Sequence, residues 1–276
     1  MTANTSPGEF SLLYKVPAVL RARDYRLYLK SGQRLVDLWL NGGAAILGHT
    51  PPNVLREIKN TASRGLFAPF PHFTEERYTK SLSKLLPGYC FRLYSAPPLG
   101  LETLFKNGAA GLWRPFIDLN SPFLITSNSP SILIPVLPGI QSWRNNLPLG
   151  LCVLAAQSDS LLAELPVSEI LPPVLLAAAA RGVYDIIASP ERTKLNYPRI
   201  FKALQNSKWE RQGVYLNLKD ETQFSPSEKS AEWETLFNQF LEAGFLLPPT
   251  PSQPLILPGG LSDGEEARLA RCLSGT

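Results

Sequence analysis

The chain has 276 residues, of which 44% are hydrophobic and 18% charged, so it is long enough for one large globular domain or two modest ones. Its formal net charge is only +4 and its basic residues are scattered, so we expect no nucleic-acid partner. The N-terminus lacks a basic-then-apolar signal pattern, and the apolar run at 170–180 is short and interrupted by prolines. We therefore expect neither a signal peptide nor a membrane span.

Few side chains are available for metal or nucleophilic chemistry. The three cysteines, Cys90, Cys152 and Cys272, are widely spaced and odd in number, which suits a reducing compartment and offers no zinc or disulfide framework. With only His49 and His72 as histidines, we expect no metal site and no hydrolytic triad, and we interpret His49 as a structural residue at a turn. The prediction is a cytoplasmic protein without a metal centre.

Periodicity and turn signals predict alternating strands and helices along the chain. In order, we expect strands at 25–29 and 35–38 around a turn at 31–33, helices at 52–62 and 74–88, strands at 123–126 and 151–154, helices at 172–187 and 191–206, a strand at 211–218, a helix capped by Ser225 and Glu228 that ends at Gly244, short strands within 245–257, and a last helix capped by Ser262 and Glu265. Thr74 is expected to cap its helix. The aromatic stripe of the helix before Gly244 is expected to lie in the core.

The segment 134–150 reads IPVLPGIQSWRNNLPLG. It resembles the lysine loop of class III aminotransferases, the fold-type I pyridoxal-phosphate (PLP) enzymes that include glutamate-1-semialdehyde aminomutase. In that family the lysine is followed by two residues, three glycines and Leu-Pro-hydrophobic-Gly, and LPLG at 147–150 matches this end. Counting back places Gln141 at the lysine position. A carboxamide is not a nucleophilic amine and cannot form the Schiff base, and no lysine occurs between Lys106 and Lys194.

Two further segments carry the resemblance. Residues 41–54, NGGAAILGHTPPNV, are similar to the family pattern Gly-x-x-x-Leu-Gly-His-x-His-Pro-x-Val. Residues 95–100, SAPPLG, stand where the family has its phosphate-binding motif Asn-Ser-Gly-(Ser/Thr)-Glu-Ala at the start of a helix. The two prolines there remove backbone donors, and two hydroxyls of the motif are missing. Ser127 and Asn128 after the expected strand 123–126 would replace the Asp-Glu whose aspartate pairs with the pyridine nitrogen.

The resemblance implies a fold and a domain organisation. The fold class is α/β, with a reduced fold-type I PLP-transferase-like large domain and an α+β small domain built from the N-terminal segment and the C-terminal third. We expect the parts at 1–40, 41–190 and 191–276, with residues 25–38 packing close to 212–257. The chain would be a shortened, degenerate member of the family, and the family's habit of dimerisation implies a homodimer.

Three functions remain open on the sequence. The first is a non-catalytic aminotransferase-like protein, a pseudoenzyme with a binding, assembly or regulatory role and no bound PLP, because the lysine, the phosphate site and the ring-nitrogen acid are all missing. The second is a PLP-dependent or other small-molecule transferase that uses the remnant cleft. The residues available to it are Ser95, Ser127, Asn128, Gln141 and Arg144. The third is a structural subunit that pairs with an active paralogue.

Overall fold

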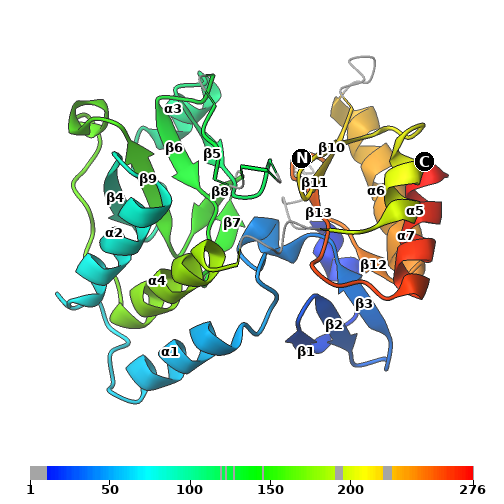
Figure 1. Ribbon diagram of the computed structural model, residues 1–276, viewed down its shortest axis with the longest axis horizontal. Helices are drawn as coiled ribbons and strands as arrows, with labels where there is room; N and C mark the ends of the chain where they lie inside the picture. The colour runs from blue at the N-terminus through cyan, green and yellow to red at the C-terminus, as the bar shows by residue number, and fades with distance from the viewer. Residues whose placement is uncertain are drawn as a thin grey trace, which may run out of the picture. The chain divides into compact units, whose positions relative to one another are not determined.

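The computed structural model describes residues 11–118, 120–121, 123–126, 128–144, 146–189, 195–219 and 226–275, without the side chains of 226–229. The chain divides into two compact units (Figure 1). Unit 1 consists of Met1–Gly42 together with Thr193–Thr276, and unit 2 consists of Gly43–Arg192. Both units combine helices with strands, so the predicted α/β class is confirmed.

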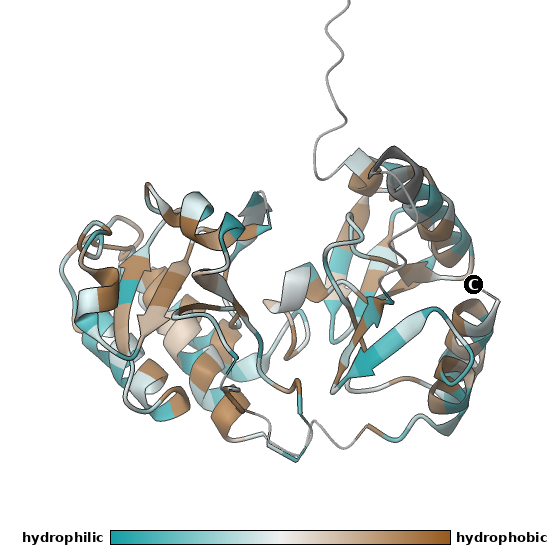
Figure 2. Cartoon of the chain, turned by 90° about the horizontal axis from the view of Figure 1, so that it is seen from above, coloured by the Kyte–Doolittle hydropathy of each residue, from teal (hydrophilic) through white to brown (hydrophobic). Residues whose placement is uncertain are grey.

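Unit 2 is built on a four-stranded sheet with the order β4-β9-β6-β5, in which β5 and β6 are parallel and the other pairs are antiparallel. Its elements are α1 (Pro52–Ala62), α2 (Thr74–Leu85), β4 (Cys90–Tyr94), α3 (Leu101–Lys106), β5 (Ala110–Trp113), β6 (Ile132–Pro135), β7 (Ser142–Arg144), β8 (Leu147–Leu149), β9 (Cys152–Ala156), η3 (Asp159–Leu162) and α4 (Pro173–Ile187). The central strands β6 and β9 are buried along their whole length and carry mostly apolar residues (Figure 2). Because β5 and β6 run in parallel, their carboxyl ends lie at the same edge of the sheet.

Helix α4 supports the loop that follows β6. It contacts both α1 and α2 to form a helical layer in this unit (Figure 1). Small residues allow this close packing, since Ala177, Ala178, Ala179 and Ala180 are each at most 1% exposed. At Gly182 the approach is closer still, because an added Cβ would lie 2.7 Å from the Cβ of Pro138 and 3.1 Å from its carbonyl oxygen. The loop leading to Gln141 is therefore held directly against α4.

One predicted strand of unit 2 is wrong. Residues 123–126 form no strand, and the strand that precedes β6 in the chain is β5 at Ala110–Trp113. The segment 123–126 is instead a loop that is bonded to the end of β5, because the Trp113 indole donates to the Leu124 carbonyl at 3.3 Å. The Phe123 ring lies 5.8 Å from the Phe116 ring, and the two ring planes are tilted by 46°. A short apolar run predicts burial, but it does not by itself distinguish a strand from a packed loop.

Unit 1 contains two sheets, with the orders β1-β2-β3-β12 and β10-β11-β13. Its elements are η1 (Ser11–Lys15), β1 (Val19–Arg23), β2 (Arg26–Leu29), β3 (Arg34–Asp37), η2 (Leu40–Gly43, shared with the start of unit 2), α5 (Pro198–Leu204), β10 (Trp209–Gln212), β11 (Tyr215–Leu218), α6 (Pro226–Glu242), β12 (Phe245–Leu246), β13 (Leu255–Ile256) and α7 (Asp263–Ser274). Strand β12 pairs in parallel with β3 through Phe245 and Val36. The Ile256 amide also donates to the Leu38 carbonyl at 2.7 Å. The expected contact between 25–38 and 212–257 is thus present.

The aromatic stripe of α6 lies in the core of unit 1, as predicted. Trp233 and Phe240 are at most 2% exposed, and both contact Trp209 with ring centroids 6.2 and 6.4 Å away. The single strand expected at 211–218 is instead the hairpin of β10 and β11. Gly213 turns the chain with a φ of 59°, a conformation that glycine adopts without the steric cost of a side chain.

Helix boundaries follow the predicted signals in part. The capping box of α7 is confirmed, with both Ser262 and Glu265 bonded as expected. The box at Ser225 and Glu228 lies outside the described residues. Helix α2 begins at Thr74, but its cap residue is Phe73, which makes no side-chain cap bond. Among the helices that the structure describes, none combines the length and apolarity that crossing a membrane requires.

Candidate functional site

The segment that resembles the lysine loop forms a β-hairpin in unit 2. After β6 the chain passes along α4 to Gln141 and then enters the hairpin of β7 and β8. Gln141 is half-buried, and its side-chain amide donates to the Leu151 carbonyl at 3.0 Å. Gly150 closes the hairpin with a φ of 86°, and a Cβ there would lie 2.9 Å from the Ile140 carbonyl oxygen. The Gln141 amide thus fastens the start of the hairpin to the residue that precedes β9.

Ser95, at the end of β4, adjoins this hairpin. Its carbonyl accepts a hydrogen bond from the Gly150 amide at 2.7 Å. Its own amide and hydroxyl both donate to the same carboxylate oxygen of Glu169, at 2.8 and 2.6 Å. The donors at the head of the 95–100 segment are therefore bound to an anion supplied by the chain itself.

Glu169 belongs to a segment, residues 165–170, that runs along the free edge of β4; we name it the β4 strap. The Glu169 amide donates to the Leu93 carbonyl at 2.8 Å, and the Leu93 amide donates to the Ser168 hydroxyl at 3.1 Å. Arg92 fixes the beginning of the strap by donating to two of its carbonyl oxygens, at 2.8 and 3.0 Å. Since β4 is the outermost strand of its sheet, the strap pairs backbone groups that would otherwise be exposed.

The rest of the 95–100 segment provides no further cradle for an anion. It leads into α3, a helix of six residues capped by Gly100 in the left-handed conformation. Two amide groups at the start of the helix already donate to backbone carbonyls and so are not free to bind an anion. The Leu101 amide donates to the Pro98 carbonyl and the Thr103 amide to the Gly100 carbonyl, each at 3.1 Å. Proline at 97 and 98 contributes no backbone donor.

A cation lies at the sheet edge beside the hairpin. Arg114 directly follows β5, so it emerges at the edge where β6 also ends. It is 9% exposed, and its guanidinium carbon lies 6.0 Å from the ring centroid of Trp143 in β7, itself 2% exposed. At this distance, the outer limit of a cation–π contact, the indole ring can contribute to stabilising the buried guanidinium.

The other reactive groups nearby are held in unreactive forms. Cys152 begins β9 with no exposed surface, and burial raises the pKa of its thiol to about 12, so it is protonated at neutral pH. Burial also raises the pKa of Tyr94, whose hydroxyl donates to the Pro166 carbonyl of the strap. In the part of the chain that the structure describes, no group of three His, Cys, Asp or Glu side chains is placed to hold a metal ion.

The structure brings together some of the residues predicted for the remnant cleft. Ser95 and Gln141 are neighbours through Gly150, and Arg144 is exposed in β7. Asn128 is exposed and precedes β6, whereas Gln141 follows that strand. Ser127 lies outside the described residues.

Sequence reasoning missed Glu169, Arg92 and Arg114. A charged residue directly after an apolar strand was a usable signal for Arg114. Nothing in the sequence around Glu169 indicates that it bonds to Ser95, which is 74 positions away.

No protein-family model matches the sequence. The chain is similar to a protein described as uncharacterized from Treponema pallidum (strain Nichols), with 26% identity over 280 residues that cover 87% of this chain and 88% of the relative. A protein of the same description from Borreliella burgdorferi is 23% identical over 261 residues, which cover 93% of this chain and 90% of that protein.

Solved aminotransferases share the architecture. An omega-transaminase from Sphaerobacter thermophilus matches with a TM-score of 0.64 at 10% identity, over 94% of this chain and 90% of its own. Ornithine delta-aminotransferase from Plasmodium falciparum matches with a TM-score of 0.63 at 12% identity, over 99% of this chain and 94% of its own. A transaminase with PLP bound gives a TM-score of 0.64 at 12% identity, over 99% of this chain and 92% of its own. The chain therefore has the fold of these aminotransferases.

Proposed function

We propose that this protein is a non-catalytic, cytoplasmic aminotransferase-like protein whose fold serves binding, assembly or regulation. The observation that carries the proposal is the state of Ser95 and Gln141. The amide and the hydroxyl of Ser95 both donate to the Glu169 carboxylate, and the side-chain amide of Gln141 donates to the Leu151 carbonyl. Neither arrangement leaves the amine or the anion donors that PLP requires.

The phosphate end of PLP does not fit the segment 95–100. A phosphate placed at Ser95 would face the Glu169 carboxylate, which repels it, and would have to replace two bonds of 2.8 and 2.6 Å. Two prolines remove further backbone donors. Each missing charge-assisted hydrogen bond costs roughly 1.5–3 kcal/mol, so the loss of two or three weakens binding by several orders of magnitude.

The pyridine end does not fit either. In the family a carboxylate after a strand keeps the ring nitrogen protonated. Here the strand next to β6 is β5, and the charged residue that follows it is Arg114, a cation. A guanidinium beside a ring nitrogen disfavours its protonated form, because like charges repel. The residues present therefore disagree with PLP at all three of its attachment points.

An absorbance titration of the full chain with PLP, followed by an aminotransferase assay, tests the proposal. We expect the spectrum to equal the sum of free PLP and protein, with no transamination of a panel of amino-acid donors. Any deviation from that sum should be the weak background of surface lysines, and it should be equally large in the Gln141→Ala variant, which is the matched control. Stoichiometric PLP binding or measurable transamination by the unmodified chain would contradict the proposal.

The same proposal includes a homodimer, as the resemblance to the dimerising aminotransferase family implies. A structural subunit that pairs with an active paralogue is the alternative assembly. Copurification of the chain with a catalytically active aminotransferase in a defined stoichiometry would favour that alternative.

A further inference from the structure

Strand β1 provides unit 1 with a free sheet edge. It stands at the end of the order β1-β2-β3-β12, so within the described sheets only one of its sides is paired with another strand (Figure 1). Along an antiparallel strand, the backbone groups of successive residues bond alternately to one side and to the other. Beside β1, the Tyr25 carbonyl and the Leu29 amide bond to the β3 side, each at 2.9 Å, so Arg26 and Tyr28 bond toward β1.

The same alternation leaves backbone groups of β1 unpaired. Arg21 and Arg23 stand opposite those two residues of β2, so the amide and carbonyl of Ala22 between them point away from the sheet. Val19, beyond a bulge, also points away, because it stands opposite Leu29. No group that the structure describes bonds to the amide or carbonyl of Ala22 or Val19. These backbone groups are therefore free to pair with an added strand.

The side chains of β1 differ between its two faces. Arg21 and Arg23 lie on the outer face and are exposed, whereas Ala22 packs against the core of unit 1. Val19 and Leu20 are 45% and 69% exposed, although both are large and apolar. A strand added at this edge continues the alternation, so its side chains would lie beside arginines on the outer face and beside Val19 on the inner face.

The two arginines of β1 lack strong acidic partners. The Arg21 guanidinium carbon lies 4.2 Å from the centroid of the Tyr28 ring, which holds this side chain over the outer face of the sheet. Arg23 approaches Asp24 at 3.8 Å, but the two side chains are 70% and 66% exposed, so the contact contributes little. Neither arginine makes another ion pair with a residue that the structure describes. The positive charge at this edge is therefore available to a partner.

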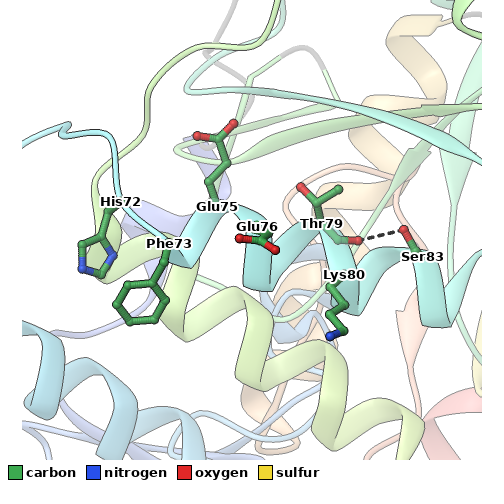
Figure 3. A pocket seen from close by; sticks show the side chains of 7 residues that line it. All are labelled: His72, Phe73, Glu75, Glu76, Thr79, Lys80 and Ser83. Carbon is green, nitrogen blue, oxygen red and sulfur yellow. Dashed lines mark hydrogen bonds between the residues drawn. The ribbon is translucent and has the colours of Figure 1, made fainter.

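The groove on the outer face of α2, of about 760 Å³, does not select a partner in the same way (Figure 3). It is lined by charges of both signs, with Glu75, Glu76 and Lys80. Glu76 and Lys80 stand one turn apart on the helix, where opposite charges can pair with each other. Such a surface favours neither sign of charge in a partner, whereas the edge of β1 favours an anionic one.

We propose that the free edge of β1 binds an extended acidic segment of a partner protein as an added strand. The backbone of the segment pairs with Ala22 and Val19, and its acidic side chains, at alternate positions, lie beside Arg21 and Arg23. A second copy of β1 does not fit, because the arginines of the two copies would face each other. The edge belongs to unit 1, whereas the Gln141 hairpin belongs to unit 2, so this proposal stands or falls independently of the missing cofactor.

Fluorescence anisotropy of a labelled peptide tests the proposal on the full chain. The probe is a short capped peptide of alternating glutamate and valine, and the same peptide with lysine in place of glutamate is its control. We expect saturable binding of the glutamate peptide that weakens as salt is added, and at least tenfold weaker binding of the lysine peptide. Equal binding of both peptides, or no saturable binding of the glutamate peptide, would overturn the proposal.

Reversing the charge of the edge tests the role of the arginines. The double variant Arg21→Glu, Arg23→Glu should bind the glutamate peptide at least tenfold more weakly, because like charges then face each other. The double variant Lys59→Glu, Lys106→Glu makes the same change of net charge at exposed positions of unit 2 and should bind as the unmodified chain does. Equal affinity of the two double variants would contradict the assignment to β1.

Ala22→Pro distinguishes strand addition from attraction by charge alone. Proline removes the outward amide at a position where an edge strand tolerates it, so binding should weaken at least tenfold, whereas Ala22→Ser keeps the amide and should bind normally. Circular dichroism checks that both variants are folded. Independently of any variant, a glutamate peptide with N-methylated valines lacks backbone donors and should also bind at least tenfold more weakly. Unchanged binding of the N-methylated peptide would mean that any polyanion, nucleic acid included, can bind there, and strand addition would be wrong.

Discussion

Glu265 in unit 1 and Glu169 in unit 2 both accept hydrogen bonds from residues far away in the sequence, but the two carboxylates have different roles. Glu265 in unit 1 is 2% exposed and accepts from Arg26, Arg34 and the Ser262 amide. Glu169 in unit 2 is exposed and accepts from the amide and hydroxyl of Ser95. A buried carboxylate with cationic partners contributes to stability, whereas an exposed one with neutral donors contributes little and mainly determines what else those donors can bind.

The pKa of Glu265 shows how strongly its hydrogen-bond partners favour the charged carboxylate. Burial alone would raise it, but the hydrogen bond from Arg26 and the bonds from Ser262 lower the pKa from 4.5 to about 2. Such a group is charged in the folded state at any ordinary pH. Because the folded pKa is the lower one, its stabilisation is fully present above about 4.5 and disappears as the pH falls toward 2.

The largest expected effect comes from removing this charge. Glu265→Gln should lower the free energy of unfolding by on the order of 3 kcal/mol at pH 7, since it leaves Arg26 without its partner and the shift of the pKa implies a similar value. Urea unfolding at several pH values measures it. The difference from the unmodified chain should shrink between pH 4.5 and 2. Glu234→Gln, which breaks the exposed pair with Lys15, is the control and should cost below about 0.5 kcal/mol.

The next effect lies in unit 2, where packing supports the Gln141 loop. Gly182→Ala should destabilise the protein by about 1–3 kcal/mol, because the new methyl group would lie 2.7 Å from the Cβ of Pro138. Gly139→Ala in the same loop is the control, since its methyl group would meet Ala179 at an ordinary 3.9 Å. Thermal unfolding of both variants measures the difference. Equal melting temperatures would show that α4 and the loop are not in the close contact described.

The Glu265 site and the site formed by Gln141, Ser95 and Glu169 also differ in how much of each could be predicted from the sequence. The pair Ser262 and Glu265 has the spacing of a capping box, so half of the Glu265 site was predictable from four consecutive residues. The loop at Gln141 was found through its resemblance to a known motif. The contact of Ser95 with Glu169 was not predictable, because it depends on the strap lying along the edge of β4, a long-range pairing without local signal. Strand β5 was missed for a related reason. Which segment pairs in parallel with β6 depends on packing across the whole sheet, and the sequence favoured 123–126 because that run is locally more apolar.

The smallest expected effect on stability is at Glu169. Glu169→Gln keeps the shape of the side chain and removes its charge, so the free energy of unfolding should change by less than about 0.5 kcal/mol. Ser95→Ala should behave similarly. Urea unfolding of both variants checks this, and a loss comparable to that of Glu265→Gln would mean that the two carboxylates do not differ as described.

The most direct test of the account restores the missing amine alone. The variant Gln141→Lys is incubated with PLP, reduced with borohydride and digested, and the fraction of chains labelled at position 141 is measured by mass spectrometry, with transamination assayed in parallel. The account predicts no labelling above that of exposed lysines such as Lys106 and no transamination, because Glu169 still occupies the Ser95 donors and Arg114 still stands at the sheet edge. Stoichiometric labelling at position 141 accompanied by transamination would contradict it.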